Sequence, residues 1–434
     1  MPTDQPNGRT RFAIVGTGAR AEMFARAIAT EHAATAELVA LADVNQIRMD
    51  THNRHLVALG APAVATYPAE EFRAMLARER VDVVLVTSVD RTHDEYIVAA
   101  LEAGRDVITE KPMTVDLPRC KRILETAART GRHVTVAFNY RYNPVHEKVR
   151  ELLAAGTIGE VGSVHFEWLL DVRHGADYFR RWHREKANSG GLLVHKSTHH
   201  FDLVNWWLGA RPETVYAQGR LFLYGAEAGA RHGYARDYDR AYASPAADDD
   251  PFAIHLATSP SLRELYLEAE SLDGYHRDRN VFAPGVTIED DLAVLVRYDT
   301  GATMSYHLTA YAPWEGYRVM FNGSAGRLEL EVVESDHVSL ASPAGEHGYQ
   351  NLLVRPYWRP PYEVDISGHA REGHGGADAR LTTVLFGRDR HAVDPLGRAA
   401  TERDGAASLL TGLAANLSLE SGLPVHAADL LDLS

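Results

Sequence analysis

Short apolar runs alternate with longer amphipathic segments along the first third of the chain. We expect strands at 11–15, 38–42, 81–86, 106–109 and 133–138, and helices at 19–30, 46–59, 93–103 and 116–130. Strands that alternate with helices in this way are typical of a parallel sheet with helices on both faces. The pattern therefore predicts a doubly wound α/β domain, which we assign to residues 1–142.

The pattern changes after residue 143, where strands follow one another with tight turns between them. We expect helices at 145–155 and 404–421, and strands at 161–172, 214–224, 292–298, 303–309, 318–322 and 327–333. Such a succession favours a large open, mainly antiparallel sheet in a second α/β domain, residues 143–434. We interpret 225–251, and much of 335–376, as loop insertions. The first extends to about residue 285 and is expected to shape a pocket or an oligomer contact.

Composition narrows the functional classes. The chain has 434 residues and a net charge of -14, which argues against nucleic acid as a partner, since phosphate binding needs a basic surface. Its single cysteine, Cys120, excludes an intrachain disulfide and fits a reducing compartment. The first ten residues lack the apolar core of a signal peptide, and no run of about 18 apolar residues is present. We therefore expect a cytoplasmic protein without a membrane span.

A glycine-rich turn, Gly16-Thr-Gly-Ala-Arg-Ala21, follows the first strand and opens the first helix. In this context Gly16 permits the tight turn, and Gly18 lets a pyrophosphate approach the helix N-terminus. Asp43 ends the second strand, where a carboxylate accepts hydrogen bonds from a ribose 2′-hydroxyl and repels a 2′-phosphate. The arrangement predicts NAD rather than NADP as cofactor. The alternative is a turn that only connects strand to helix.

Three further motifs complete an ordered set: Thr87-Ser-Val-Asp-Arg-Thr-His93, Glu110-Lys-Pro112 and Gly190-Gly-Leu-Leu-Val-His-Lys-Ser-Thr-His-His-Phe-Asp202. Together with the glycine turn, they resemble the Gfo/Idh/MocA family of nicotinamide-dependent oxidoreductases, from about residue 12 to residue 208. The resemblance implies a Rossmann domain followed by an α/β domain with a large open sheet, and an active site between them. It also implies a homo-oligomer, either a dimer or a tetramer, since the face of such a sheet is a common contact surface.

By this resemblance Lys111 is the central catalytic residue. An ammonium beside the reacting hydroxyl stabilises developing alkoxide, or takes its proton if burial lowers the lysine pKa. Without the resemblance, an exposed loop lysine would be the simpler interpretation. His93 is expected beside the nicotinamide, with helix capping as its alternative. The expected cofactor-binding residues are Gly16, Gly18, Ala19, Arg20, Asp43, Thr87, Ser88, His93, Glu110, Lys111 and Asn139.

Two histidines of the third motif are further catalytic candidates. His199 matches the family's histidine and is expected to pass the substrate proton, with a core histidine as the alternative. Asp202 shares its helix face and is a candidate to orient it. His195 departs from the family, which often has aspartate there, so it is expected to serve a different proton. The two histidines are four residues apart, but the Lys-Ser-Thr between them lacks the zinc-protease glutamate, and we expect no metal.

Positive charge is dense between residues 178 and 186, in a chain of net negative charge. It is either a solvated loop with local ion pairs or a clamp for a carboxylate, sulfonate or phosphate on the substrate. The expected substrate-binding residues are Arg141, Tyr178, Arg180, Arg181, His183, Lys196 and Asp202.

The leading functional hypothesis is an NAD-dependent dehydrogenase that takes hydride from a hydroxyl carbon of a sugar or cyclitol, either neutral or anionic. The first alternative is a redox-neutral glycoside hydrolase. It would oxidise C3 transiently, remove the C2 proton, eliminate the C1 substituent, add water and return the hydride. The second alternative is a non-catalytic regulator that binds NAD and sugar, against which the presence of Lys111 and His199 argues.

Overall fold

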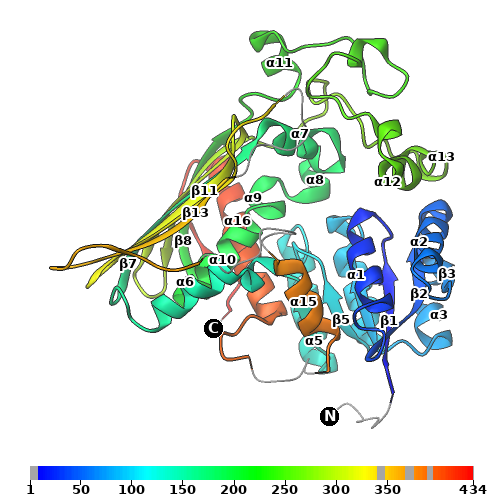
Figure 1. Ribbon diagram of the computed structural model, residues 1–434, viewed down its shortest axis with the longest axis horizontal. Coiled ribbons are helices and arrows are strands. Elements are labelled where there is room, and N and C mark those ends of the chain that lie inside the picture. The colour runs from blue at the N-terminus through cyan, green and yellow to red at the C-terminus, as the bar shows by residue number, and fades with distance from the viewer. Residues whose placement is uncertain (1–7, 340–347, 367–375, 389–393, 434) are drawn as a thin grey trace.

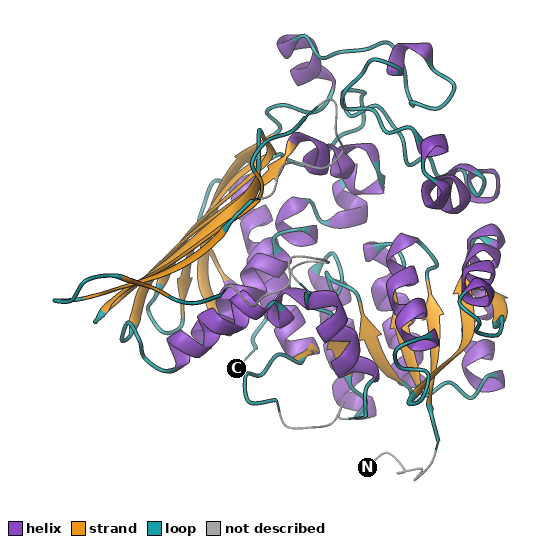
Figure 2. Ribbon diagram, viewed as in Figure 1, coloured by secondary structure: helices purple, strands orange, loops and turns teal. Residues whose placement is uncertain are grey.

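The computed structural model describes residues 8–339, 348–366, 376–388 and 394–433 (Figure 1). Most of the N-terminal segment 1–10, and parts of 335–376, lie outside this range. The described chain builds two sheets, each with its own helices (Figure 2). No helix in these residues is long and apolar enough to cross a membrane.

The first sheet has seven strands in the order β15-β6-β5-β4-β1-β2-β3. Its parallel strands are β1 (Thr10–Val15), β2 (Ala36–Asp43), β3 (Ala65–Pro68), β4 (Val83–Val86), β5 (Asp106–Thr109) and β6 (Val134–Val136). Its helices are α1 (Ala19–Ala29), α2 (Gln46–Ala58), α3 (Phe72–Arg78), α4 (His93–Glu102) and α5 (Leu117–Thr130). The predicted Rossmann fold is confirmed. Sequence reasoning missed β3, a short edge strand with no buried residue to mark it, and also missed α3, a helix of only seven residues.

The second sheet has nine strands in the order β14-β13-β12-β11-β7-β10-β9-β8-β16. They are β7 (Val161–Asp171), β8 (Pro212–Arg220), β9 (Asp291–Tyr298), β10 (Thr303–Ala312), β11 (Glu315–Gly323), β12 (Gly326–Ser335), β13 (Gln350–Pro356), β14 (Tyr362–Glu363) and β16 (Val425–His426). Only the β7–β10 pair is parallel among the described pairings of this sheet, so the mainly antiparallel prediction is confirmed.

The helices α6 (Pro144–Ala154), α10 (Thr198–Leu208) and α16 (Glu402–Ser421) lie between the second sheet and the first domain (Figure 1). The segment 335–376 was expected to be loop for much of its length, and part of it forms a strand that the sequence analysis did not find. It contains β13, which pairs with β12 and buries Leu352 and Val354 completely. This strand is short and lies between polar segments, so its pattern alone did not reveal it.

The C-terminal part of the chain contributes to both domains. Helix α15 (Ala377–Phe386) places the Phe386 ring 5.1 Å from that of Phe12 in the first core. Strand β15 (Ala400–Thr401) pairs antiparallel with β6. The returning chain therefore links the two domains and helps to fix how they face each other.

The segment between β8 and β9 extends away from the second sheet toward α2 (Figure 1). It carries the short helices α11 (Ala226–His232), α12 (Pro260–Leu262) and α13 (Glu270–Asp273). Three further short helices, α7 (Val172–Arg180), α8 (Lys186–Ser189) and α9 (Leu192–His195), lie between this insertion and α10. Together they form the upper wall of the space above the carboxyl ends of the parallel strands.

Candidate active site

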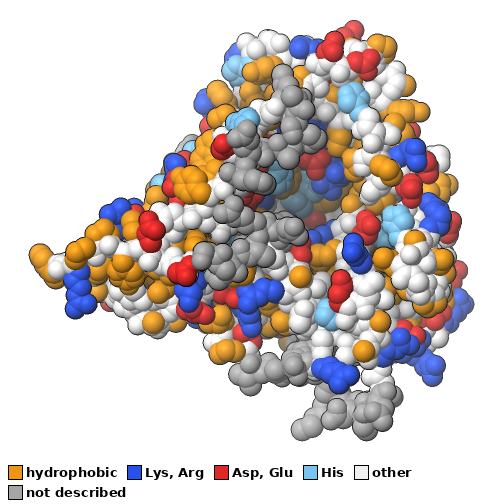
Figure 3. Space-filling model, viewed as in Figure 1, with side chains coloured by type: hydrophobic (Ala, Val, Ile, Leu, Met, Phe, Trp, Pro, Cys, Tyr) orange, Lys and Arg blue, Asp and Glu red, His pale blue; other side chains and the backbone are white. Residues whose placement is uncertain are grey.

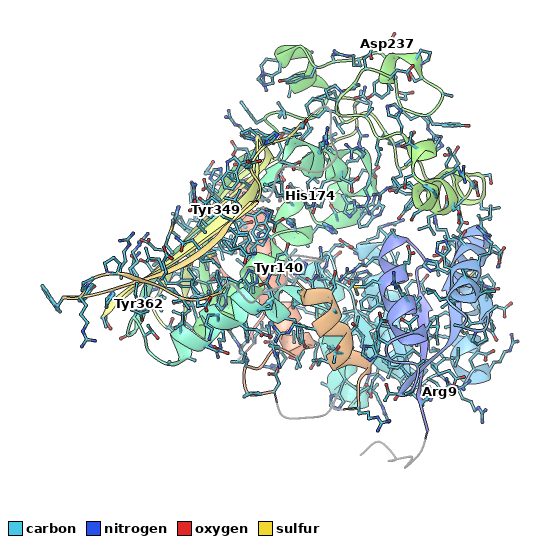
Figure 4. The ribbon with its side chains drawn as sticks, in the orientation of Figure 1. Arg9, Tyr140, His174, Asp237, Tyr349 and Tyr362 are labelled. Carbon is cyan, nitrogen blue, oxygen red and sulfur yellow. The ribbon has the colours of Figure 1, made fainter. Side chains whose placement is uncertain are left out.

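A cavity of about 630 Å³ lies between the two domains, at the carboxyl ends of β1, β2, β4 and β5. Figure 3 shows a hollow near the centre of this face, with histidine and charged side chains inside it. Tyr140 and His174 line the cavity and lie near the centre of Figure 4, whereas Asp237 lies at the far end of the insertion. All the expected cofactor-binding and catalytic residues line this one cavity: Gly16, Gly18, Ala19, Arg20, Asp43, Thr87, Ser88, His93, Glu110, Lys111, Asn139, His195 and His199.

The glycine turn has the geometry that a dinucleotide requires. Gly16 has a φ of +89°, and a Cβ there would lie 2.4 Å from the Cα of Ser88. Gly18 precedes the first residue of α1, and a Cβ added to it would meet nothing closer than 3.7 Å. The Asp43 carboxylate accepts hydrogen bonds from the Thr17 N–H at 2.5 Å and the Thr17 hydroxyl at 2.8 Å. The open turn, the helix N-terminus and this carboxylate fit NAD.

Lys111 follows β5 and is held among charged groups. Its Nζ donates a hydrogen bond to the His195 carbonyl oxygen at 3.1 Å. Burial lowers the pKa of Lys111 to about 8, although the charges of Asp90 and Glu110 oppose this shift. Arg20 holds the Glu110 carboxylate through its Nε at 2.5 Å. A lysine in this state can release or take a proton near neutral pH.

The structure pairs His195 with Asp90, a residue that sequence reasoning did not single out. His195 Nδ1 lies 2.5 Å from Asp90 Oδ2, and both side chains are at most 10% exposed. Burial raises the pKa of Asp90, and burial together with the Lys111 charge lowers that of His195. The neutral imidazole is thus the favoured form. Asp90 lies in the motif after β4, which was the available signal, but its partner is distant in sequence.

His199 lies in α10 rather than on a helix shared with His195, which ends α9. Its ring stacks on Tyr140 with the ring centroids 4.4 Å apart. Lys196 lines the same wall, and its Nζ lies 4.8 Å from the centre of the Trp168 ring. Burial lowers the pKa of Lys196. The cavity therefore has a cationic and aromatic wall formed by Lys196, Tyr140 and His199.

Two expected substrate-binding residues are engaged elsewhere. Asp202 accepts two hydrogen bonds from Arg141, at 2.8 and 2.6 Å, and both side chains are almost fully buried. Neither residue lines the cavity. The Asp202 carboxylate is bonded to Arg141 rather than to His199, and it does not face the space where a substrate would bind. The pair instead joins the turn after β6 to α10, because a buried guanidinium requires a carboxylate partner.

The basic run is also divided by the fold. Tyr178, Arg181 and His183 line the cavity. Arg180 does not, because it donates to the Phe252 carbonyl oxygen and pairs with Asp177. The charges at 178–186 therefore form no single clamp, although Arg181 lines the cavity while it donates to the Asp177 carboxylate at 2.9 Å.

His93 lines the cavity at the start of α4 with both ring nitrogens close to carbonyl oxygens. Nδ1 lies 2.9 Å from the Pro112 oxygen, and Nε2 lies 3.0 Å from the Ser88 oxygen. His93 thereby connects the segment after β5 to the segment after β4. These contacts hold the turn that presents Lys111.

A glycine turn at a helix N-terminus, an acidic strand end and a shared cavity define an NAD-binding oxidoreductase of two domains. Residues 10–138 match the NAD-binding Rossmann-fold model of the Gfo/Idh/MocA oxidoreductases, and residues 150–355 match the family's C-terminal α/β domain. The chain belongs to this family. It is 37% identical over 362 residues to YteT of Bacillus subtilis (strain 168), named as an oxidoreductase, covering 80% of this chain and 82% of YteT.

Other similar proteins include the inositol 2-dehydrogenase of Rhizobium meliloti (strain 1021). It is 29% identical over 232 residues, which cover 53% of this chain and 62% of that protein. Among solved structures, the WlbA dehydrogenase from Bordetella pertussis, in complex with NADH and UDP-GlcNAcA, superposes with a TM-score of 0.65 at 18% identity. The alignment covers 96% of this chain and 99% of WlbA, and it supports the fold.

Proposed function

We propose that this protein takes hydride from a secondary hydroxyl carbon of a sugar or cyclitol. The main observation behind this proposal is that the glycine turn, Lys111, the Asp90–His195 pair and His199 all line the same cavity. Bound NAD supplies the hydride acceptor, and the chain's own residues must then manage the hydroxyl proton. Named inositol 2-dehydrogenases among the similar proteins support this substrate class.

Lys111 is the group we assign to the reacting hydroxyl. Its lowered pKa, about 8, lets the free amine accept the hydroxyl proton as the C–H bond breaks. His199, stacked on Tyr140, is fixed in place to receive or return that proton. The neighbouring Lys196 adds positive charge that stabilises developing alkoxide in a buried site.

The Asp90–His195 pair favours a second candidate function, redox-neutral glycoside cleavage. In the tautomer whose Nδ1–H donates to the Asp90 carboxylate, a neutral His195 carries a lone pair on Nε2 that can act as a base separate from Lys111. Oxidation at C3 acidifies the C2 proton, and this reaction needs such a second base. Removal of that proton expels the C1 substituent, water adds to the double bond, and the hydride returns to C3.

An anionic substrate is supported by Arg181 alone among the three arginines of the basic run. Arg181 lines the cavity with His183, while its NH1 is bonded to Asp177. A guanidinium in this position suits a carboxylate or phosphate on the sugar. Arg181→Gln should raise KM for uronic acids or sugar phosphates more than for the matching neutral sugars. Equal changes in KM would contradict an anion-binding role.

The experiment that separates the functions is a near-ultraviolet spectrum of the purified protein with NAD and a panel of cyclitols, sugars and aryl glycosides. NADH that accumulates in proportion to substrate indicates a dehydrogenase. Release of the aglycone without net NADH formation indicates the glycosidase. If no panel member yields NADH or aglycone while NAD still binds, the proposed class of substrate is wrong.

Assembly and location also belong to the proposal. The family resemblance favours a homo-oligomer formed through the open face of the nine-stranded sheet, in the cytoplasm. Light scattering during gel filtration tests the assembly. A monomer at all concentrations would exclude it.

A further inference from the structure

The insertion between β8 and β9 is bonded to the cofactor domain. Arg48 of α2 donates from Nε to the Leu265 carbonyl oxygen at 2.9 Å and pairs with Asp273 at 2.6 Å. Asn45 Nδ2 donates to the Ala269 carbonyl oxygen at 2.8 Å. These groups are largely buried, with Arg48 10% and Asp273 15% exposed at their side chains. Residues 262–275, which we call the cover, are thus fastened beside the strand end that carries Asp43.

The cover places one side chain at the glycine turn. The Tyr266 hydroxyl accepts a hydrogen bond from the Ala19 N–H at 3.0 Å. A Cβ added to Gly18 would lie 3.7 Å from the same hydroxyl. Ala19 is the first residue of α1, and the N-terminus of this helix is where a dinucleotide pyrophosphate binds. Tyr266, Asp273 and Tyr275 all line the cofactor cavity.

The Tyr266 hydroxyl keeps its own proton to donate after it accepts from Ala19. A hydroxyl that accepts from another donor becomes a stronger donor itself, and a phosphate oxygen is a charged acceptor. The guanidinium of Arg277 lies 4.7 Å from the centre of the Tyr266 ring and adds positive charge behind it. This geometry suits a diphosphate next to the hydroxyl.

Arg20 is the one cationic side chain of the glycine turn, and it is already paired with carboxylates, so a further donor would help to bind a pyrophosphate. Arg20 is bonded to Glu110 at 2.5 Å and to Asp378 at 3.3 Å. It therefore serves the site mainly by holding the residue before Lys111. The main chain of the turn and the Tyr266 hydroxyl of the insertion are the donors that we assign to the pyrophosphate.

We propose that Tyr266 binds the NAD pyrophosphate and that the cover slows the dissociation of NAD. The proposal rests on NAD binding and not on the identity of the substrate. Release of NAD requires the cover to lift, which breaks the bonds of Arg48 and Asn45 to it.

The test measures the cofactor itself. Purified protein is passed through cofactor-free buffer and denatured with acid, and the released NAD and NADH are quantified by chromatography. The dissociation rate is then measured from NADH fluorescence after mixing with excess NAD. We compare wild type with Tyr266→Phe and Asp273→Asn. Tyr242→Phe is the matched control, since Tyr242 belongs to the same insertion, is 49% exposed and does not line the cavity.

We expect near-equimolar cofactor in wild type and in Tyr242→Phe. Tyr266→Phe should speed dissociation about tenfold or more, as the loss of a hydrogen bond to a charged group does. Asp273→Asn should also speed it, because it weakens the bond to Arg48 without changing the size of the side chain. Thermal unfolding midpoints close to that of wild type show that the variants are folded.

Three outcomes overturn the proposal. Wild type that elutes without cofactor refutes retention. A dissociation rate in Tyr266→Phe equal to that of Tyr242→Phe refutes the role of the hydroxyl. Slower dissociation in Tyr266→Phe or Asp273→Asn shows that the cover competes with NAD. A protein that retains NAD but turns over no sugar leaves this inference standing and refutes the proposed function instead.

Discussion

Replacement of Asp90 by asparagine tests whether the pair with His195 acts in the reaction. The two groups are 2.5 Å apart and almost completely buried, so solvent cannot replace either partner. Removal of one partner from a buried hydrogen bond costs about 1–3 kcal/mol. If this full cost is felt in the alignment of His195 in the transition state, kcat falls about 5- to 150-fold at about 1.36 kcal/mol for each factor of ten. KM changes little, because His195 acts on a proton rather than on binding.

The assay is turnover of whichever substrate the panel identifies, for Asp90→Asn, His195→Ala and the double variant. When His195 is already replaced by alanine, the additional Asp90→Asn change should lower kcat less than about threefold, because Asp90 no longer has its partner. Asp82→Asn is the matched control. Its carboxylate accepts the Arg11 N–H at 2.9 Å at the start of β4, away from the cavity. Unchanged kcat in Asp90→Asn, or additive losses in the double variant, would refute the reasoning.

Three further predictions concern the same site. Because burial lowers the pKa of Lys111 to about 8, kcat for alcohol oxidation should rise with pH and level off above that value. Lys111→Arg, which stays protonated, should abolish this rise; a wild-type profile flat from about pH 6 to 10 would contradict the role. Gly16→Ala should lower the free energy of unfolding by more than about 2 kcal/mol in a denaturant titration, since positive φ and the contact with Ser88 both oppose a Cβ. Gly18→Ala should fold normally but bind NAD more weakly in calorimetry, and equal stability of both variants would refute the difference. Asp43→Asn should lower the preference for NAD over NADP at least about tenfold, which ratios of the two dissociation constants measure; an unchanged ratio would mean that Asp43 only holds the turn.

Local patterns were enough for most of the first domain. Its strands are short, buried and apolar, and its helices carry regular polar faces, so each element was visible within its own few residues. Lys111 and the glycine turn were also readable, because strand, turn and helix are contiguous in the chain. The edge strand β3 and the outer strand β13 were missed, since neither has a long apolar run.

Contacts between distant segments could not be derived in this way. Asp90 and His195 are 105 residues apart, and Ala19 and Tyr266 are 247 residues apart. No periodicity or spacing links such residues, because folding of both domains and the insertion brings them together. The same fold pairs Asp202 with Arg141, although helical spacing placed Asp202 beside His199.

The sequence by itself determined the Rossmann fold, the open second sheet and the cofactor class, because these depend on local hydrogen bonding and on the burial of neighbouring side chains. Only the tertiary structure decided which charges face the cavity. A buried charge requires a partner. Arg141 pairs with Asp202 and Arg180 pairs with Asp177, and neither arginine lines the cavity, whereas Arg181, which also pairs with Asp177, does. The catalytic candidates are the groups that line the cavity: Lys111, His195 with its partner Asp90, and His199.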